Sequence, residues 1–377
     1  MPRRTALLLV VCCAARLVAQ DLENIQIHGF ATQGFLYSSH NNYLTMKSSS
    51  GSLQWTEGAI SVADQVTDKL RVGIQLHMRQ MGDLGGPNVV VDWASGDFKF
   101  NDKLGFRAGK IKAPLGLFNE SQDVDSLFLW TLLPQSMYPV DNMDFNLSEM
   151  GGEIYGALPL GKRGGHLQYV GHIGDNSLDA NGGYVEQLAE FGLTFPTPPS
   201  GKTYGADLQW VTPWRELTVG ASALNDALDG TGPQGTVRLA ATFTMAYYAR
   251  WDRGRVHLAG EYWRTPLNIL LTVGPNAMPY PVDQRAWYPM ASYSVMKRLQ
   301  IGGYYSHYVN KAGDTSLPAN YSKDWVISGR YDFNDYFYGK LEGHFLHGTG
   351  LGYYTSTNPD GLKPNSNLLA ARIGFSF

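Results

Sequence analysis

The chain ends in LLAARIGFSF, residues 368–377, and the side chains of this stretch alternate in character. Apolar or aromatic residues follow one another at every second position, with small or charged residues such as Arg372 between them. Because successive side chains of a strand point to opposite faces, this two-residue period makes one face apolar and the other polar. A membrane β-barrel meets two solvents in this way, whereas an edge strand of a soluble sheet is the alternative. The aromatic end, Phe375 and Phe377, is predicted to act as an insertion signal for the outer membrane.

The same alternation recurs upstream. In one stretch, Leu70, Val72 and Ile74 interleave with Arg71 and Gln75. A soluble β-sandwich also shows such stripes, so the connections between strands have to distinguish the two folds. The further alternating segments are 204–210, 256–262 and 325–332.

Short and long connections follow one another regularly. Seven short ones carry Asp, Asn, Gly, Pro or charged residues, as turns do, at 64–68, 101–103, 159–165, 212–216, 251–255, 296–298 and 334–335. Eight longer stretches lie near 38–51, 80–88, 113–149, 175–202, 225–236, 265–284, 310–323 and 348–366. Seven turns and eight loops join sixteen strands. The sequence therefore predicts an all-β fold, a transmembrane antiparallel β-barrel of about 16 strands with short periplasmic turns and long extracellular loops.

A barrel of this size has a definite place and content. Hydrocarbon offers no hydrogen-bond partners, so the sheet must close to leave no unpaired edge. Sixteen strands enclose water, whereas about eight strands fill the interior with side chains. We therefore expect a barrel in the bacterial outer membrane, in contact with membrane lipid.

Residues 1–19 are predicted to be a cleaved signal peptide, which leaves 20–377 as the barrel. The segment has a basic start, a ten-residue apolar run and a small residue before the cut. Both cysteines lie inside it, so the mature chain has none. The alternative, a lipoprotein anchored at Cys12 or Cys13, is disfavoured because the bulky Val11 precedes Cys12.

Composition excludes two classes of protein. The predicted mature chain has 27 basic and 33 acidic residues, because three arginines lie in the signal, and this balance argues against a nucleic-acid partner. No run of about 18 apolar residues occurs, so no transmembrane helix is expected. The 43 Gly, 22 Tyr, 16 Phe and 9 Trp suit a barrel instead.

The stretch 113–149 is the longest connection, and a loop of this length is more often functional than idle. Its apolar part, 127–133, is poorly suited to extracellular water. We expect the segment to fold inward and narrow the channel; a lid or packing loop outside the lumen is the alternative. Folding inward places acidic residues near the pore axis, namely Glu120, Asp123, Asp125, Asp141 and Asp144.

Basic residues on the polar strand faces are expected to line the opposite wall. An acidic loop facing a basic wall creates a transverse field that sorts solutes by charge. Solvated lumen charges without selectivity are the alternative. Lys110 and Lys112 stand where the alternation is poor, so their facing is left open. The predicted wall consists of Lys69, Arg71, Arg79, Arg107, Arg330, Lys340 and Arg372.

Aromatic residues near strand ends are predicted to form girdles at the two membrane surfaces, with packing in a soluble core as the alternative. The predicted girdle residues are Tyr37, Trp55, Trp93, Trp210, Trp214, Trp251, Trp263, Trp287, Tyr336 and Tyr338.

Nothing in the sequence singles out an enzyme, a metal site or a cofactor. His344 and His347 fall on opposite faces of a strand, so a shared metal is not expected. A nucleophile elbow with plausible partners, a phosphate-binding loop and a CxxC pair are all missing from the sequence. Ser292 or Ser306 with His307 is the nearest approach to a catalytic set, and no feature favours it.

Three segments carry a family resemblance: GFATQGFLYSS (29–39), FRAGKIKAPLGLFNE (106–120) and PQSMYP (134–139). They resemble the phosphate-selective porin O and P family and its broader relatives. The resemblance implies a sixteen-stranded barrel, a constricting third loop and a homotrimer. Phosphate selectivity in that family rests on arginines and lysines at the constriction, whereas 113–149 of this chain contains acids and no lysine.

The sequence as a whole predicts a porin, a water-filled channel for passive diffusion of small hydrophilic solutes or ions. The alternative is an adhesin or ligand-binding barrel whose lumen is closed.

Overall fold

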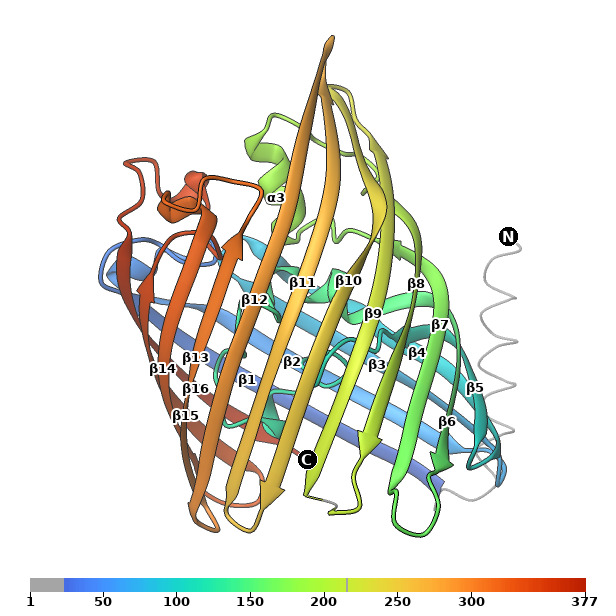
Figure 1. Ribbon diagram of the computed structural model, residues 1–377. Coiled ribbons are helices and arrows are strands. Elements are labelled where there is room, and N and C mark those ends of the chain that lie inside the picture. The colour runs from blue at the N-terminus through green and yellow to red at the C-terminus, as the bar shows by residue number, and fades with distance from the viewer. Residues whose placement is uncertain (1–23, 215) are drawn as a thin grey trace, which may run out of the picture.

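A computed structural model describes residues 24–214 and 216–377, and the predicted signal peptide lies outside this range. Sixteen antiparallel strands form a closed barrel in which each strand pairs with its sequence neighbours and β1 pairs with β16 (Figure 1). This confirms the predicted fold class. The strands are β1 (Ile25–Ser38), β2 (Ser52–Gln65), β3 (Leu70–Met81), β4 (Leu84–Asn101), β5 (Leu104–Lys112), β6 (Ser148–Pro159), β7 (His166–Ser177), β8 (Ser200–Val211), β9 (Leu217–Thr231), β10 (Gly235–Arg253), β11 (Val256–Val273), β12 (Asn276–Met296), β13 (Leu299–Asn310), β14 (Tyr321–Asp332), β15 (Phe337–His347) and β16 (Asn365–Ser376).

In residues 24–214 and 216–377, helices are few and occur between strands. None of those in the described part of the chain combines the length and apolarity that a membrane span needs. The α-helices are α2 (Met143–Leu147) and α3 (Gly183–Glu190), and the 3₁₀ turns are η2 (Ser48–Ser50), η3 (Asp125–Leu127), η4 (Val140–Asn142), η5 (Pro318–Asn320) and η6 (Thr355–Thr357).

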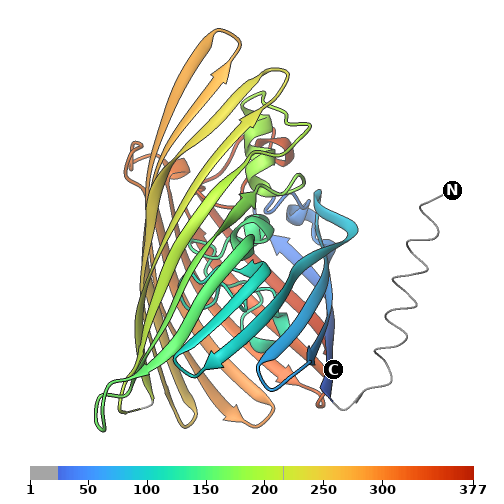
Figure 2. The same ribbon diagram turned by 90° about the vertical axis from the view of Figure 1, so that its right-hand side faces the viewer.

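The seven predicted turns all join strands at one end of the barrel, which we call the turn side. At the other end, the loop side, three predicted loops prove to be tight hairpins, because β3–β4, β9–β10 and β11–β12 continue almost to the tip. The last two hairpins rise above the rest of the rim (Figure 2). Their inner apolar residues Val237 and Leu271 pack against Leu193, which explains why the strands extend so far.

The outer face of the barrel is apolar, as the alternation predicts. Trp325 and Ile327 on β14 are 64% and 67% exposed, whereas Val326 and Ser328, which alternate with them, face inward and are buried. An exposed apolar band around a closed barrel matches a hydrocarbon surround. The chain end closes this band, since the Phe377 amide donates to Gly29 O at 3.0 Å.

Two large apolar clusters pack the interior of the barrel. One apolar cluster joins the 113–147 segment to the inner faces of β9–β14, with Leu129, Trp130 and Tyr138 at its centre. A second cluster joins the β1–β2 loop to β1–β3, β15 and β16 around Trp55. The flank from β4 to β8 lies outside both clusters.

Three predicted girdle residues are corrected by the structure. Trp55, Trp263 and Tyr338 face inward and are at most 8% exposed. Trp55 stacks under the Arg372 guanidinium, 4.5 Å from its ring centre, in space left by Gly34, whose missing side chain would meet the indole at 2.7 Å. Sequence position near a strand end does not reveal this facing. Five other predicted girdle residues are exposed on the surface, namely Tyr37, Trp210, Trp214, Trp287 and Tyr336.

Candidate pore constriction

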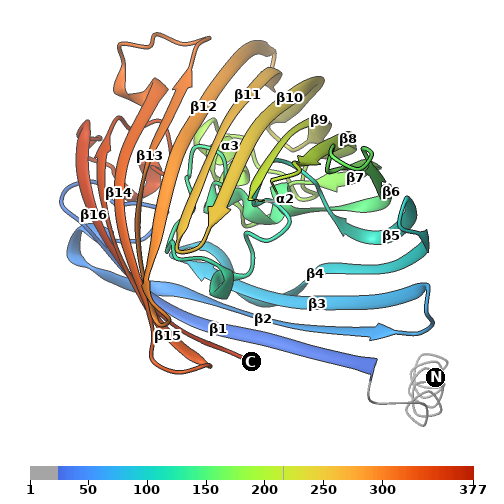
Figure 3. The same ribbon diagram turned by 60° about the horizontal axis from the view of Figure 1, so that its bottom comes forward.

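The segment 113–147 between β5 and β6 lies within the ring of strands (Figure 3). Its apolar residues Leu129, Trp130, Leu132 and Leu133 are at most 9% exposed. Because a loop has no ladder to satisfy its backbone, the wall must supply hydrogen-bond partners. Side chains of the surrounding strands do so at several points.

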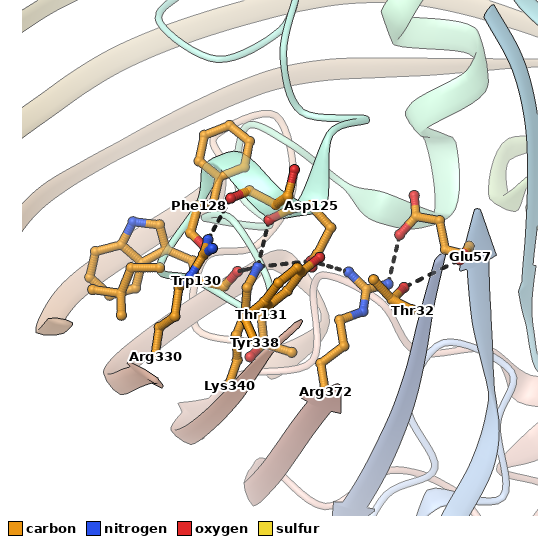
Figure 4. A network of polar contacts seen from close by, with 12 residues as sticks. Thr32, Glu57, Asp125, Phe128, Trp130, Thr131, Arg330, Tyr338, Lys340 and Arg372 are labelled. Atoms are coloured by element: carbon orange, nitrogen blue, oxygen red, sulfur yellow. Dashed lines mark hydrogen bonds and ion pairs between the residues drawn. The ribbon is translucent and has the colours of Figure 1, made fainter. Parts of the chain in front are cut away.

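Asp125 in η3 is the most strongly held point of the segment (Figure 4). Its carboxylate lies 2.9 Å from Lys340 Nζ and 2.5 Å from Arg372 Nη1, and it accepts a 2.7 Å hydrogen bond from the Tyr338 hydroxyl. Arg372 also contacts Glu57 at 2.7 Å, so the charges form a chain across β2, β15 and β16. Burial raises the pKa of Asp125, but Arg372 and Lys340 outweigh this effect and hold the pKa far below its usual value.

The wall cations also donate to backbone carbonyls of the segment. Lys340 Nζ donates to Asp125 O at 2.7 Å and to Trp130 O at 3.0 Å. Arg330 Nη1 donates to Ser126 O at 2.5 Å and to Phe128 O at 3.0 Å (Figure 4). These cations therefore anchor the segment rather than stand free in the lumen.

Wall carboxylates hold the backbone amides in the complementary way. Glu342 on β15 accepts from the Thr131 and Leu132 amides at 3.0 and 2.9 Å. His344 lies 3.0 Å from Glu342 and 2.7 Å from Asp324, which orients the carboxylate. A buried carboxylate needs several donors, and here backbone and imidazole provide them.

Glu261 on β11 anchors the start of the segment. It accepts from the Leu117 amide at 3.1 Å, the Tyr138 hydroxyl at 2.6 Å and Trp263 Nε1 at 3.0 Å. The neighbouring Gly116 has φ +68°, and a Cβ there would come within 2.3 Å of the Glu261 carboxylate. Only glycine fits this turn without strain.

Two further ion pairs fix the side of the segment that faces β3 and β5. Lys112 contacts Asp123 at 2.6 Å, and Arg79 contacts Asp144 at 3.0 Å. Burial raises the pKa of Asp144, but Arg79 more than offsets it, so the pKa lies below its usual value.

Asp141 differs from the other acids of the segment. It accepts from the Tyr354 hydroxyl at 2.5 Å and forms no ion pair with any described Lys or Arg. Its side chain is buried, and this burial raises the pKa of Asp141.

Water-accessible charge remains on the flank that the apolar clusters leave free. Glu120 is exposed and lies within electrostatic range of Arg107, Lys112 and Asp207. Arg107 on β5 is partly exposed and pairs with Asp97 at 3.1 Å and with Glu153 at 2.6 Å. Although water reaches Glu120, the surrounding wall weakens its hydration and raises its pKa.

The structure thus sorts the predicted site residues into groups. Of the five acids, Glu120 meets water, Asp123, Asp125 and Asp144 are ion-paired, and Asp141 is buried without a cation. Of the predicted wall, Arg79, Arg330, Lys340 and Arg372 contact the segment, and Arg107 faces the free flank.

Two wall residues lie elsewhere. Arg71 is exposed near the turn side and donates to Gln26 at 3.1 Å. Lys69 is corrected: it precedes β3 in a turn, where its amide donates to the Thr67 hydroxyl at 3.2 Å, so alternation does not apply to it. The sequence reasoning missed Glu57, Glu261 and Glu342, although inward glutamates on apolar strands were the available signal.

The described residues contain no group of three or more His, Cys, Asp or Glu arranged to hold a metal ion. No protein-family model and no curated protein matches the chain.

Solved structures do match, at low identity. The chain is similar to OmpF of Salmonella typhi, solved in complex with daunomycin, with 16% identity and a TM-score of 0.59 over 94% of this chain and 98% of that chain. It is also similar to an anion-selective porin from Comamonas acidovorans (11%, 0.56, over 93% and 98%) and to the outer-membrane channel DcaP of Acinetobacter baumannii (11%, 0.56, over 94% and 97%). At these identities the likeness concerns the fold, and the chain has the fold of bacterial outer-membrane porins.

Proposed function

We propose that the protein is an outer-membrane porin through which small hydrophilic solutes or ions diffuse passively. The observation that carries this proposal is the β4–β8 flank of the lumen, where the exposed Glu120 lies within electrostatic range of the partly exposed Arg107 and Asp207. Buried charges without partners are costly, so partly exposed charges across a passage require water there. The 113–147 segment, packed against the opposite wall, narrows this passage.

Single-channel recording in a planar bilayer tests the proposal. Stepwise openings in symmetric salt support a pore, and a membrane that stays silent at all voltages contradicts it. Heat-modifiable migration of the same sample in a gel confirms that the barrel is folded, so silence cannot be attributed to misfolding.

The second candidate is an adhesin or ligand-binding barrel with a closed lumen. The two apolar clusters inside the barrel favour it, because they fill much of the interior with Trp55, Trp130 and their neighbours. A folded barrel that is silent in bilayers but binds cells or ligands supports this candidate over the pore.

We propose general diffusion rather than phosphate selectivity. Lys112, Lys340 and Arg372 each pair with a carboxylate in the structure, so these cations are engaged rather than free for an anion. The reversal potential in a salt gradient measures the resulting ion preference. We propose no enzymatic activity and no cofactor.

A homotrimer is proposed from the family resemblance. The valines Val89, Val90 and Val91 on β4 are 40–64% exposed and offer an apolar surface for a second copy. Cross-linking in detergent, read against the mass of the heat-dissociated chain, tests this assembly.

A further inference from the structure

A cavity of about 490 Å³ opens on the loop side above the 113–147 segment. Its walls are the inner faces of the tall β9–β12 strands, the region of α3 and the end of the segment around Phe145. Cavities of this size accept molecules of drug-like dimensions. The cavity stands at the entrance to the proposed passage.

The lining of the cavity is largely apolar. Leu239, Ile269 and Val282 line it, and the last two belong to the stretch 265–284 that the sequence predicted to be a loop. Aromatic rings with hydroxyl groups, Tyr280 and Tyr308, stand beside them. Such a surface gains free energy by removing an apolar molecular body from water.

The charges of the lining have one sign. Within the described part of the chain, the lining residues include Asp141, Glu190 and Asp226, and none of them is Lys, Arg or His. The Asp226 Oδ1 atom is buried and has no hydrogen-bond partner among the described residues. Glu190 accepts from the Thr355 amide and hydroxyl at 2.5 and 2.6 Å, and Asp141 accepts from the Tyr354 hydroxyl at 2.5 Å. Neither Asp141 nor Asp226 forms an ion pair with a described Lys, Arg or His, so their charge is not compensated by a cation of the protein.

We propose that this vestibule binds amphipathic organic cations, with the apolar body against the aliphatic and aromatic wall and the cationic group near Asp141 and Asp226. The inference rests on the proposed function, because binding at the mouth selects what enters the passage. Aromatic faces attract a cation, and the carboxylates add direct charge complementarity. An anion of the same shape meets repulsion and leaves both carboxylates uncompensated.

Calorimetric titration of the detergent-purified protein tests this site. Benzyltrimethylammonium is the probe, benzenesulfonate supplies the same ring with the opposite charge, and tetramethylammonium supplies the charge without the ring. We expect the first to bind at least ten-fold more tightly than either of the others. Equal binding of the cation and the anion overturns the proposal.

Two variants locate the cation. Asp226→Asn and Asp141→Asn are each expected to weaken benzyltrimethylammonium about five-fold or more. Asp229→Asn is the matched control, because Asp229 lies on the same strand but is exposed and paired with Arg238. Unchanged binding in both test variants overturns the proposal, and heat-modifiable migration verifies that each variant is folded.

Bilayer recording separates this inference from the proposed function. A conducting channel that fails to bind the probe refutes only the cation site, whereas probe binding by a silent barrel refutes only the pore.

Discussion

Replacing Asp125 by Asn removes the charge that holds the 113–147 segment against the wall. The side chain is 4% exposed and touches both Lys340 and Arg372, at 2.9 and 2.5 Å. Breaking a buried ion pair by removing one partner typically costs about 3–5 kcal/mol, because the remaining charge is left uncompensated. We expect the lower end of this range, since the amide oxygen can still accept from Tyr338 and Arg372 retains Glu57.

About 3 kcal/mol multiplies the population of a detached segment by roughly a hundred-fold. In single-channel records this appears as more frequent transitions and a larger open conductance than in the unmodified channel. Asp335→Asn is the control, because Asp335 is exposed in the β14–β15 turn. Records of Asp125→Asn that match those of Asp335→Asn refute the anchoring argument.

The pH dependence of this anchor follows from the direction in which the pKa of Asp125 is shifted. The folded pKa of Asp125 is depressed, so the stabilisation is fully present above the unfolded pKa of about 4 and is lost as pH falls through the folded value. Channel noise from this source should therefore stay constant between about pH 5 and 7.

Three other predictions concern the segment and the vestibule. Deleting Asp123 to Asp144 widens the conductance if the segment narrows the passage, and unchanged conductance rejects that role. Gly116→Ala strains a backbone with positive φ and crowds Glu261, so we expect the free energy of unfolding to fall by about 1–3 kcal/mol. Gly192→Ala also has positive φ but open space around the added Cβ, so its loss should be smaller. Equal losses in the two variants reject the steric contribution at Gly116. Binding of benzyltrimethylammonium should weaken as pH falls through the raised pKa of Asp141, because the cation favours the ionised carboxylate. Calorimetric titrations from pH 7 to 4 measure this change, and a constant affinity counts against a role of Asp141.

Much of the barrel could be predicted from the sequence because each strand alternates apolar and polar residues, a pattern visible within a few residues. Trp325 and Ile327 alternate with Val326 and Ser328, and this period alone fixes which side meets lipid. The turns carry their own chemistry, so the strand count follows from them. Three predicted loops, including 265–284, are hairpins instead, and the prediction was wrong there because Pro and Gly residues also occur within paired strands.

The interior was less predictable because it depends on partners distant in sequence. Alternation assigns Arg330, Lys340 and Arg372 to the lumen, but it cannot reveal that they bind a segment more than 200 residues earlier. The same limit hides the role of Glu342, whose amide partners lie 211 and 210 residues away. Facing is a local property, whereas pairing across the lumen is a tertiary one.

Cysteine accessibility at the constriction tests the proposed passage most directly, because the only native cysteines, Cys12 and Cys13, lie in the predicted signal. The variant Glu120→Cys, reconstituted in a bilayer, is treated with a charged thiol reagent, and Leu317→Cys in the exposed β13–β14 loop serves as the control. We expect a stepwise fall in single-channel current at position 120 and no change at position 317. A current that is unaffected at position 120, with the thiol shown to be modified, contradicts the claim that solutes pass between Glu120 and the β4–β8 wall.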